Sequence, residues 1–136
     1  MLDEDRGKIR NVKTYKQLIS YEGMMRHRKI TPTDIDGLID YNGNAFIFLE
    51  CKQIGKGMDF GQRKAYENLI DGLAESGKPA CCVHFVHNKA HDEIIIAKDC
   101  EVVELYFQHK WSEYHNTLLD TIIKLEERFR KMNILL

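Results

Sequence analysis

The sequence predicts an α/β fold, in which a central mixed β-sheet is flanked by helices and a long helix forms the C-terminal end. The run at residues 45–49 is apolar on both faces, as in a strand that is covered on two sides, and further strand-like runs follow it. Segments with helical spacing of apolar residues alternate with these runs. With 136 residues and a hydrophobic content of 43%, the chain is long enough for one buried core. We expect a single domain over residues 1–136.

The first half of the chain is expected to hold a helix and a β-hairpin. Apolar residues recur at helical spacing over residues 8–25, and Glu22 shares their face of the predicted helix. Two strands are expected next, at residues 34–41 and 45–52. The intervening Asn42-Gly43 is a strong hairpin signal.

The second half is expected to hold two helices and three strands. Asp59 can cap a helix that runs to about residue 76, where Gly77 and Pro79 are stop signals. Residues 80–86, 93–97 and 102–107 have strand-like composition.

The expected final helix, residues 111–133, carries an apolar seam with spacings of four and three. The seam consists of Trp111, His115, Leu118, Ile122, Leu125, Phe129 and Met132. It can cover one face of the protein's own sheet. Because Leu119 and Ile123 add a second apolar row, a homodimer through this helix is a further hypothesis.

The charge balance excludes a strongly basic protein. Twenty Lys and Arg residues against 21 Asp and Glu residues give a formal net charge of −1, so any nucleic-acid binding needs a local basic patch. One candidate patch is formed by Lys52, Lys56, Arg63 and Lys64, and a solvated charged face is its plain alternative.

The cysteines and the N-terminal residues favour a cytoplasmic location. The four cysteines form no C-x-x-C pair and lie in or beside apolar runs, which favours buried thiols over disulfides or structural zinc. They are Cys51, Cys81, Cys82 and Cys100. The acidic residues 3–5 are unlike a signal peptide, and no apolar run approaches the ~20 residues of a membrane span.

Charged residues at the end of the second expected strand are the main functional signal. Glu50 and Lys52 follow the apolar run on one face of the strand, where charges are costly to desolvate unless they face each other, a metal ion or a cleft. A three-residue loop at 42–44 would set Asp36 across from Glu50, whereas a two-residue turn would set it across from Leu49 on the other face. Two opposed carboxylates repel each other unless a cation such as Mg²⁺ or Mn²⁺ lies between them. The apolar pairs suit either register, so the longer loop is inferred from function.

The residues around this strand end resemble the PD-(D/E)xK nuclease superfamily, and particularly its RecB-like branch. The matching pieces are Asp36, the triplet Glu50-Cys51-Lys52 after a hydrophobic strand, and Gln62 with Tyr66 as a Q-x-x-x-Y helix motif. The resemblance covers roughly residues 20 to 90. It implies a restriction-endonuclease-like core and a metal-dependent nuclease that acts on DNA.

The resemblance also implies a role for each matched residue. Asp36 and Glu50, with the backbone carbonyl of Cys51, would hold Mg²⁺ or Mn²⁺, which polarises the scissile phosphate and lowers the pKa of a bound water. Lys52 would orient that water and offset charge on the phosphate oxygens. Gln62 would position the lysine or the water.

Three further residues are candidates for substrate contacts and one for a metal contact. Tyr66 would lie beside the substrate backbone, and the basic Lys56 and Arg63 are weaker candidates for the same function. Glu22 resembles the family's carboxylate on the first helix, a ligand of a second metal or a support for the first.

These residues also have structural interpretations. Gln62 lies three residues after Asp59, as in a capping box, and Tyr66 lies on an apolar stripe that suits the core. Glu50 and Lys52 can form a simple salt bridge.

Other polar residues in the chain leave further alternatives open. Asp34 shares a strand face with Asp36 and is a rival ligand, and Glu22 can pair with Arg26 or Arg28. The three histidines near Cys81 and Cys82 are expected at strand ends and in loops rather than around zinc. They are His84, His87 and His91.

The leading hypothesis is a small Mg²⁺- or Mn²⁺-dependent endonuclease or exonuclease, acting as a stand-alone phage or host-defence enzyme. A homodimer would suit cutting both strands of a duplex. The rival is a non-catalytic module that keeps the fold and binds nucleic acid or protein, and a third hypothesis is an interaction subunit that docks through its C-terminal helix.

Overall fold

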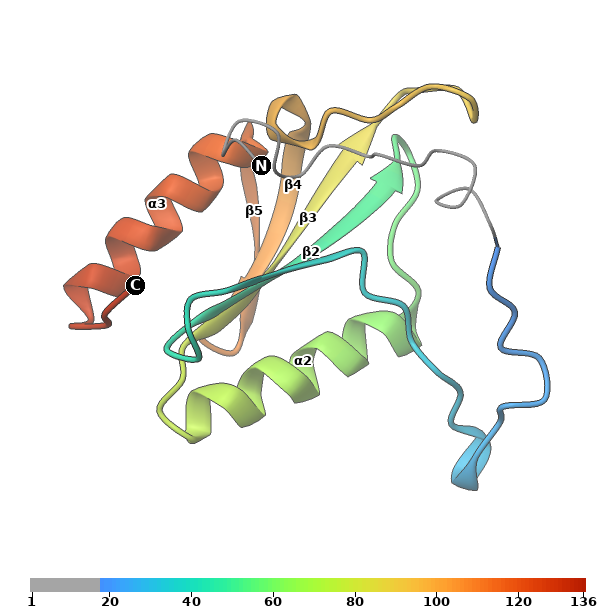
Figure 1. Ribbon diagram of the computed structural model, residues 1–136, viewed down its shortest axis with the longest axis horizontal. Coiled ribbons are helices and arrows are strands. Elements are labelled where there is room, and N and C mark those ends of the chain that lie inside the picture. Colours follow the sequence, from blue (N-terminus) through green and yellow to red (C-terminus); the bar gives the residue numbers. More distant parts are fainter. Residues whose placement is uncertain (1–17) are drawn as a thin grey trace, which may run out of the picture. The chain divides into compact units, whose positions relative to one another are not determined.

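The computed structural model describes residues 18–136, and Figure 1 shows the arrangement of its helices and strands. The chain divides into two units, Met1–Pro32 and Thr33–Leu136, which are described separately. The single domain expected over residues 1–136 stays a prediction. Within the described residues, no helix combines the length and the hydropathy that a membrane crossing requires.

The described part of the first unit is not the helix expected there. Residues 18–25 contain a turn around Gly23, whose φ of 81° lies in the left-handed region, and His27–Lys29 form a single 3-10 turn. All side chains from residue 18 to residue 30 are exposed, so no apolar face is buried that would stabilise a helix. The rest of the expected helix, residues 8–17, lies outside the described residues.

The second unit is an α/β fold built on a five-stranded mixed sheet, which confirms the expected class. In chain order the strands are β1 (Gly37–Asp40), β2 (Phe46–Gln53), β3 (Ala80–His87), β4 (Glu101–Phe107) and β5 (Lys110–Thr117), and this is also their order in the sheet. Only β2 and β3 are parallel, and α2 (Phe60–Glu75) forms the crossover that parallel neighbours need. The C-terminal helix α3 (Leu118–Lys131) follows β5 directly.

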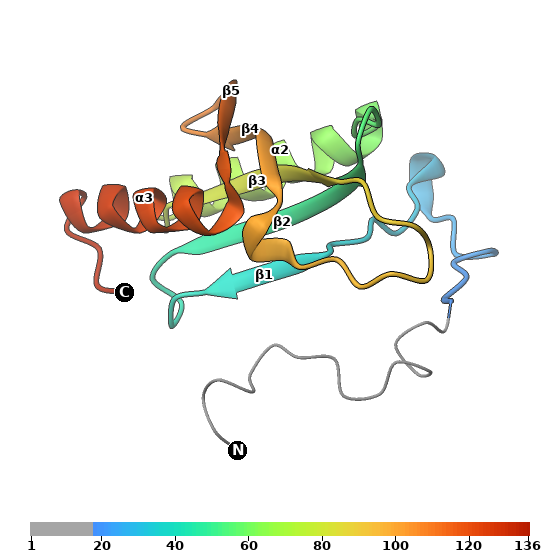
Figure 2. The same cartoon turned by 90° about the horizontal axis from the view of Figure 1, so that it is seen from above.

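The two helices cover opposite faces of the sheet, as Figure 2 shows. On the face of α2, Phe48 of β2 packs in one cluster with Tyr66. On the face of α3, Ile47 packs in a second cluster with Phe129. Because successive residues of a strand point to opposite faces, β2 and β3 are buried on both sides, which explains their apolar composition.

The β1–β2 hairpin has the three-residue loop that the sequence argument favoured. The Tyr41 amide donates to the Ala45 carbonyl at 3.0 Å, and the strand ladder keeps this register. Asn42 and Gly43 have left-handed φ values of 55° and 79°, which these two residue types tolerate. The expected register is therefore confirmed, although β1 begins at Gly37, three residues later than expected.

The helix expected at residues 59–76 and the strands expected at 80–86 and 102–107 are confirmed within one or two residues. The strand expected at residues 93–97 is wrong. Glu93 closes a turn instead, because its amide donates to the Ala90 carbonyl and its carboxylate accepts from the Ala90 amide at 2.9 Å. Ile94, Ile95 and Ile96 remain exposed in the loop that follows.

The helix expected at residues 111–133 is only partly correct, since residues 110–117 form β5. Gln108 and His109 adopt left-handed φ values of 52° and 66°, which turn the chain back along β4. The open edge of β4 takes this segment as its partner, although apolar spacings of three and four suggested a helix. The helix begins only at Leu118, where the Thr117 hydroxyl accepts from the Asp120 amide at 3.2 Å.

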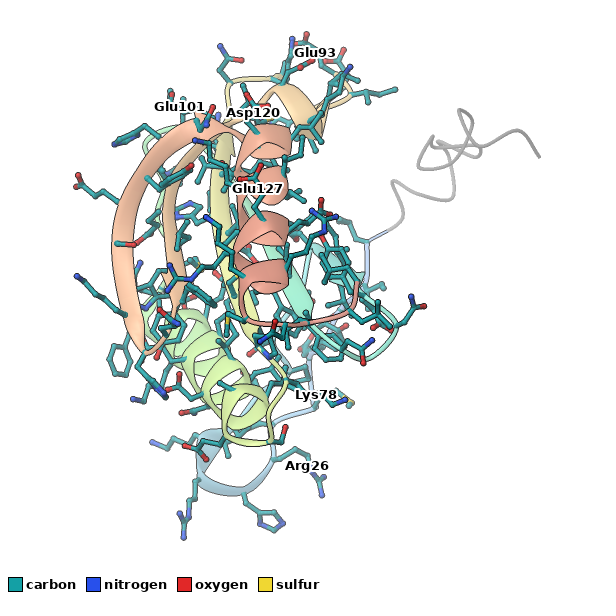
Figure 3. The ribbon with its side chains drawn as sticks, turned by 90° about the vertical axis from the view of Figure 1, so that its left-hand side faces the viewer. Arg26, Lys78, Glu93, Glu101, Asp120 and Glu127 are labelled. Atoms are coloured by element: carbon teal, nitrogen blue, oxygen red, sulfur yellow. The ribbon has the colours of Figure 1, made fainter. Side chains whose placement is uncertain are left out.

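The apolar seam of the C-terminal segment is therefore divided between two elements. Trp111 and His115 belong to β5, whereas Leu118 and Phe129 of α3 are buried against the sheet. Asp120 and Glu127 are exposed on α3, and Figure 3 labels both. Only the part of the seam on α3 thus covers the protein's own sheet, and the homodimer stays a prediction.

Candidate functional site

The candidate site lies at the end of β2, where β1 has stopped pairing with it. The last pair of the β1–β2 ladder is Gly37 with Leu49, so Asp36 and Glu50 follow one step further along each strand. The Oδ2 atom of Asp36 accepts a hydrogen bond from the Cys51 amide at 2.8 Å. This bond fixes the exposed Asp36 carboxylate against β2, beside Glu50.

Glu50 is the buried centre of the site, with 2% of its surface exposed. The Tyr66 hydroxyl on α2 donates to Oε1 of Glu50 at 2.7 Å. The Lys52 ammonium lies 3.2 Å from Oε2, and its side chain is 27% exposed. Both oxygens of the carboxylate are thus held in place, and the lysine links this buried group to the surface.

The surroundings of Glu50 raise the pKa of its carboxyl group. Burial raises the pKa of Glu50 above its ordinary value of 4.5, the hydrogen bond from Tyr66 lowers it, and the charge and hydrogen bond of Asp36 raise it again. The attraction of Lys52, the smallest of these effects, lowers the pKa. Together the effects raise the pKa of Glu50. The ionised form would gain from a further cation nearby.

The oxygen atoms at the site suit a hard divalent cation. In a strand, the amide and the carbonyl of one residue point toward the same neighbouring strand. The Cys51 carbonyl therefore lies on the same side as the Cys51 amide, toward Asp36. Among residues 18–136, no group of three or more His, Cys, Asp or Glu side chains is arranged as a metal site. Two carboxylates, this carbonyl and water molecules are a ligand set that Mg²⁺ accepts.

The Cys51 thiol takes no part in this arrangement. It belongs to the cluster on the α3 face, and burial raises its pKa to about 11. All four cysteines are free thiols, as expected from the sequence, and Cys81 and Cys82 are buried.

Gln62 lies in the first turn of α2, above the sheet. The Asp59 carboxylate caps the helix by accepting from the Gln62 amide at 2.7 Å, so half of the expected capping box is present. The side-chain Oε1 of Gln62 is buried and has no hydrogen-bond partner among the described residues, so it does not complete the box. This side chain is available to the site.

The candidate substrate contacts lie in different environments. Tyr66 is buried and holds Glu50, so its hydroxyl is directed into the protein. Arg63 bonds both oxygens of Glu104 at 3.1 and 2.9 Å, and its guanidinium lies 4.0 Å from the ring centroid of Trp111. Lys56 is exposed in the loop that follows β2.

The structure distinguishes the two remaining carboxylate candidates from Asp36. Both Asp34 and Asp36 are exposed and precede β1, and the hydrogen bond from the Cys51 amide holds Asp36 against β2. Glu22 is exposed in a turn of the first unit, and the shared apolar face expected for it is wrong in the described residues. Its role as a metal ligand stays a prediction.

Sequence reasoning missed two residues of this polar cluster, His84 and Glu104. His84 was expected at a strand end, but it lies within β3 and is 2% exposed, beside Glu50 on β2 and Glu104 on β4. Its Nδ1 atom lies 2.8 Å from Oε2 of Glu104. The signal was available, because a polar residue inside each of two apolar runs needs a buried partner.

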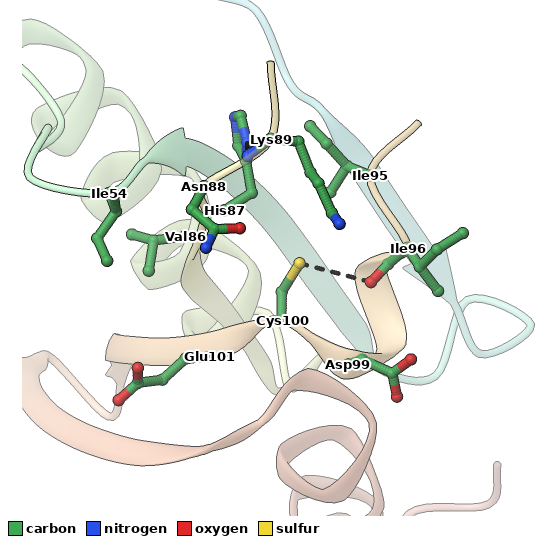
Figure 4. A pocket seen from close by; sticks show the side chains of 10 residues that line it. All are labelled: Ile54, Val86, His87, Asn88, Lys89, Ile95, Ile96, Asp99, Cys100 and Glu101. Atoms are coloured by element: carbon green, nitrogen blue, oxygen red, sulfur yellow. Dashed lines mark hydrogen bonds between the residues drawn. The ribbon is translucent and has the colours of Figure 1, made fainter. Parts of the chain in front are cut away.

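A separate hollow of about 370 Å³ lies where β2 and β3 end, and Figure 4 shows its lining. Ile54 and Val86 form part of its wall, with Ile95 and Ile96 from the loop before β4. The Cys100 thiol donates to the Ile96 carbonyl at 3.5 Å. None of the residues that line this hollow belongs to the polar cluster around Glu50.

Comparisons with known proteins were made for the whole chain. No family model, no curated protein and no solved structure matches it. The functional argument below rests on the polar cluster itself.

Proposed function

We propose that the protein is a Mg²⁺- or Mn²⁺-dependent nuclease of the PD-(D/E)xK class that hydrolyses phosphodiester bonds in DNA. One observation carries the proposal: Asp36 and Glu50 are fixed side by side at a strand end, and Lys52 lies 3.2 Å from Glu50. A bound divalent cation would supply Lewis-acid polarisation of the phosphate and a more acidic water.

The charges of the site support a cation-dependent reaction. Glu50 lies beside the carboxylate of Asp36 and pairs with the ammonium of Lys52, which leaves an excess of one negative charge when all three groups are ionised. A phosphodiester is itself an anion and would be repelled by such a site. The two carboxylates and the Cys51 carbonyl would hold the cation that reverses this repulsion.

Each residue of the cluster has a distinct task in the proposed reaction. Lys52 has three N–H donors and uses one on Glu50, so the others can orient the attacking water or bind a phosphate oxygen. Asp36 is exposed, so a phosphate can approach the site from the β1 edge. Tyr66 fixes the orientation of Glu50 and is a positioning residue rather than a substrate contact.

The order of the elements also supports the proposal of a restriction-endonuclease-like core. The β1–β2 hairpin carries Asp36 and Glu50, and α2 carries Gln62 and Tyr66 over the same face of the sheet. The three segments that resemble the family motif thus contribute to one cluster on a mixed sheet flanked by helices.

The direct test incubates the purified protein with supercoiled, linear and branched DNA, and with RNA, in Mg²⁺, Mn²⁺ or EDTA. We expect cleavage of DNA that requires the metal and is lost in Asp36→Asn and Lys52→Ala. Lys78→Ala is the matched control, because Lys78 is exposed beyond the end of α2. Cleavage that persists in EDTA or in both site variants would refute the proposed mechanism, and cleavage of RNA alone would correct the substrate.

A non-catalytic binding module is the second candidate, and one observation favours it. Both oxygens of Glu50 already have protein partners, Tyr66 and Lys52, so the cluster could serve stability alone. This alternative predicts that no substrate is cleaved and that nucleic-acid binding is the same for the wild type and Asp36→Asn.

A further inference from the structure

A hollow of about 320 Å³ lies between α3 and the turn that joins β4 to β5. Phe107 and Leu125 are its apolar lining residues, and both belong to the core on the α3 face of the sheet. Glu50 lies on the other face, where it bonds Tyr66 of α2. The remaining lining residues are Gln108, Lys124, Glu127, Arg128 and Lys131. The nuclease proposal gives this hollow no role.

Three cationic side chains line one side of the hollow. Lys124, Arg128 and Lys131 follow each other at spacings of four and three, which places them on one face of α3. All three are exposed, and the ion pairs between described residues include none of them. Glu127 is the one acidic side chain in the lining, so the hollow has an excess of two positive charges.

Arg128 is held in place by the turn between β4 and β5. Its Nη2 atom donates to Oε1 of Gln108 at 3.3 Å, and its Cζ atom lies 5.9 Å from the ring centroid of Phe107. The second distance is within the range of cation–π attraction. A guanidinium has five N–H donors, so those that are not used on Gln108 remain for a ligand. Their planar arrangement suits the oxygens of a phosphate group.

The turn that carries Gln108 is costly to form. Gln108 and His109 have left-handed φ values of 52° and 66°. Turns with two such values favour Asn and Gly, because other side chains strain the backbone in this conformation. A glutamine at this position therefore indicates a use for its side chain, and the contact with Arg128 is such a use.

The row of cations matches the charge density of a nucleic-acid backbone. A rise of 1.5 Å per residue places Lys124 and Lys131 about 10 Å apart along the axis of α3. One strand of B-DNA carries about three phosphates over this length. Because the whole chain has a net charge of −1, DNA binding needs a local patch of this kind.

We propose that the hollow between α3 and the β4–β5 turn binds the phosphate backbone of double-stranded DNA through Lys124, Arg128 and Lys131. It lies on the face of the sheet opposite Glu50, so it anchors a stretch of duplex other than the one that is cleaved. The choice of DNA as the polyanion rests on the proposed function.

Fluorescence anisotropy of a labelled random-sequence duplex, measured with the full chain in EDTA, tests this contact without cleavage. We expect the double variant Lys124→Gln/Arg128→Gln to raise Kd about tenfold. The slope of the logarithm of the binding constant against the logarithm of the salt concentration should become shallower by about two, because two phosphate contacts are lost. Lys78→Gln/Arg130→Gln is the matched control, since it removes the same charges at exposed positions that do not line the hollow. It should bind like the wild type.

Gln108→Gly separates binding from stability. Glycine adopts a left-handed φ without strain, so this variant should melt at a temperature no lower than the wild type. The lost contact with Arg128 should still weaken DNA binding. A variant that melts at a lower temperature and binds DNA as tightly as the wild type would contradict the role of the turn.

The anisotropy experiment also decides between this contact and its rivals. The inference is overturned if the wild type does not bind the duplex, or if the two double variants bind it equally well. It is also overturned if poly-glutamate binds the hollow more tightly than the duplex does, which would indicate an acidic protein partner. If the wild type cleaves nothing but the first double variant binds DNA more weakly than the control, the nuclease proposal fails and this inference stands. Metal-dependent cleavage with equal binding in both double variants has the reverse meaning.

Discussion

At the scale of one residue, the buried carboxylate of Glu50 costs stability, and the proposed function gives a reason for it. Its carboxylate is buried beside Asp36, and burial is the largest cause of its raised pKa. A protein that needed only a stable strand would place an apolar residue here, as at Phe48 on the same face. The buried charge therefore supports the proposed cation-binding site.

Replacing Glu50 by Gln should stabilise the metal-free protein and abolish its response to metal. The amide still accepts from Tyr66 but carries no charge to desolvate, so we expect a gain of about 1 kcal/mol, or a rise in Tm of a few degrees. Thermal melts with EDTA and with Mn²⁺ measure both effects. Glu75→Gln, at an exposed carboxylate on α2, is the matched control and should leave both melts unchanged. A lower Tm in EDTA for Glu50→Gln would contradict this account.

The pH dependence of stability should separate Glu50 from Glu104. Glu50 has a raised pKa, so its contribution is present below 4.5 and is lost as the pH rises through the folded-state value. Glu104 has a lowered pKa, so its contribution is present above 4.5 and is lost as the pH falls through the folded-state value. In Tm profiles measured in EDTA, Glu50→Gln should remove the fall of Tm with rising pH that Glu50 causes. Glu104→Gln should remove the fall of Tm with decreasing pH that Glu104 causes. The same change of the Tm profile in both variants would contradict the opposite pKa shifts assigned to Glu50 and Glu104.

At the scale of the element, the β1–β2 hairpin determines whether Asp36 and Glu50 meet. Side chains alternate along a strand, so a shift of one residue would send Asp36 to the opposite face. The three-residue loop and the ladder that begins after it prevent this shift.

Two single-residue deletions test this dependence on register. Deleting Asn44 leaves Asn42-Gly43 as a two-residue turn and still pairs Tyr41 with Ala45, so the Mn²⁺-induced rise in Tm should remain. Deleting Asp40 instead moves every earlier residue of β1 by one place and sets Asp36 across from Leu49. We expect this variant to lose the response to Mn²⁺, and thermal melts in Mn²⁺ and EDTA compare the two. A retained response in the Asp40 deletion would show that register does not control the site.

Helix α3 offers a second prediction at this scale, because its two sides differ in burial. Phe129 is fully buried and contacts the rings of Tyr41 and Phe107 edge-on, so Phe129→Ala should cost about 3–5 kcal/mol of the free energy of unfolding. Ile123 is 43% exposed, and Ile123→Ala should cost less than about 1 kcal/mol. Urea denaturation measures both values.

The same helix tests the predicted homodimer. If the exposed row of Leu119 and Ile123 joins two copies, Ile123→Asp should halve the mass measured by light scattering without lowering the monomer's stability. A wild-type protein that is monomeric at all concentrations would remove this hypothesis.

At the scale of the whole molecule, the elements with their own local signals were predicted well. Asp59 and Gly77 mark the ends of α2, and the apolar run of β2 needs two covered faces. β5 was missed because Gln108 and His109 form its turn without the usual Gly or Asn, and because an edge strand has little apolar alternation.

The candidate site was predictable only where one motif spans neighbouring elements. Asp36, Glu50 and Lys52 follow from the hairpin and the strand end. His84 and Glu104 come from later strands, and only the order of strands in the sheet brings them beside Glu50. The polar positions inside two apolar runs were visible in the sequence, but the strand order that makes them partners was not.

The central claim is that Asp36 and Glu50 bind a divalent cation, and anomalous diffraction from crystals of the full chain grown with Mn²⁺ tests it most directly. The account predicts one manganese peak in contact with both carboxylates and the Cys51 carbonyl, and no such peak in Asp36→Asn. Crystals that contain Mn²⁺ elsewhere but show no peak at these oxygens, with the ion pair between Lys52 and Glu50 unchanged, would contradict it.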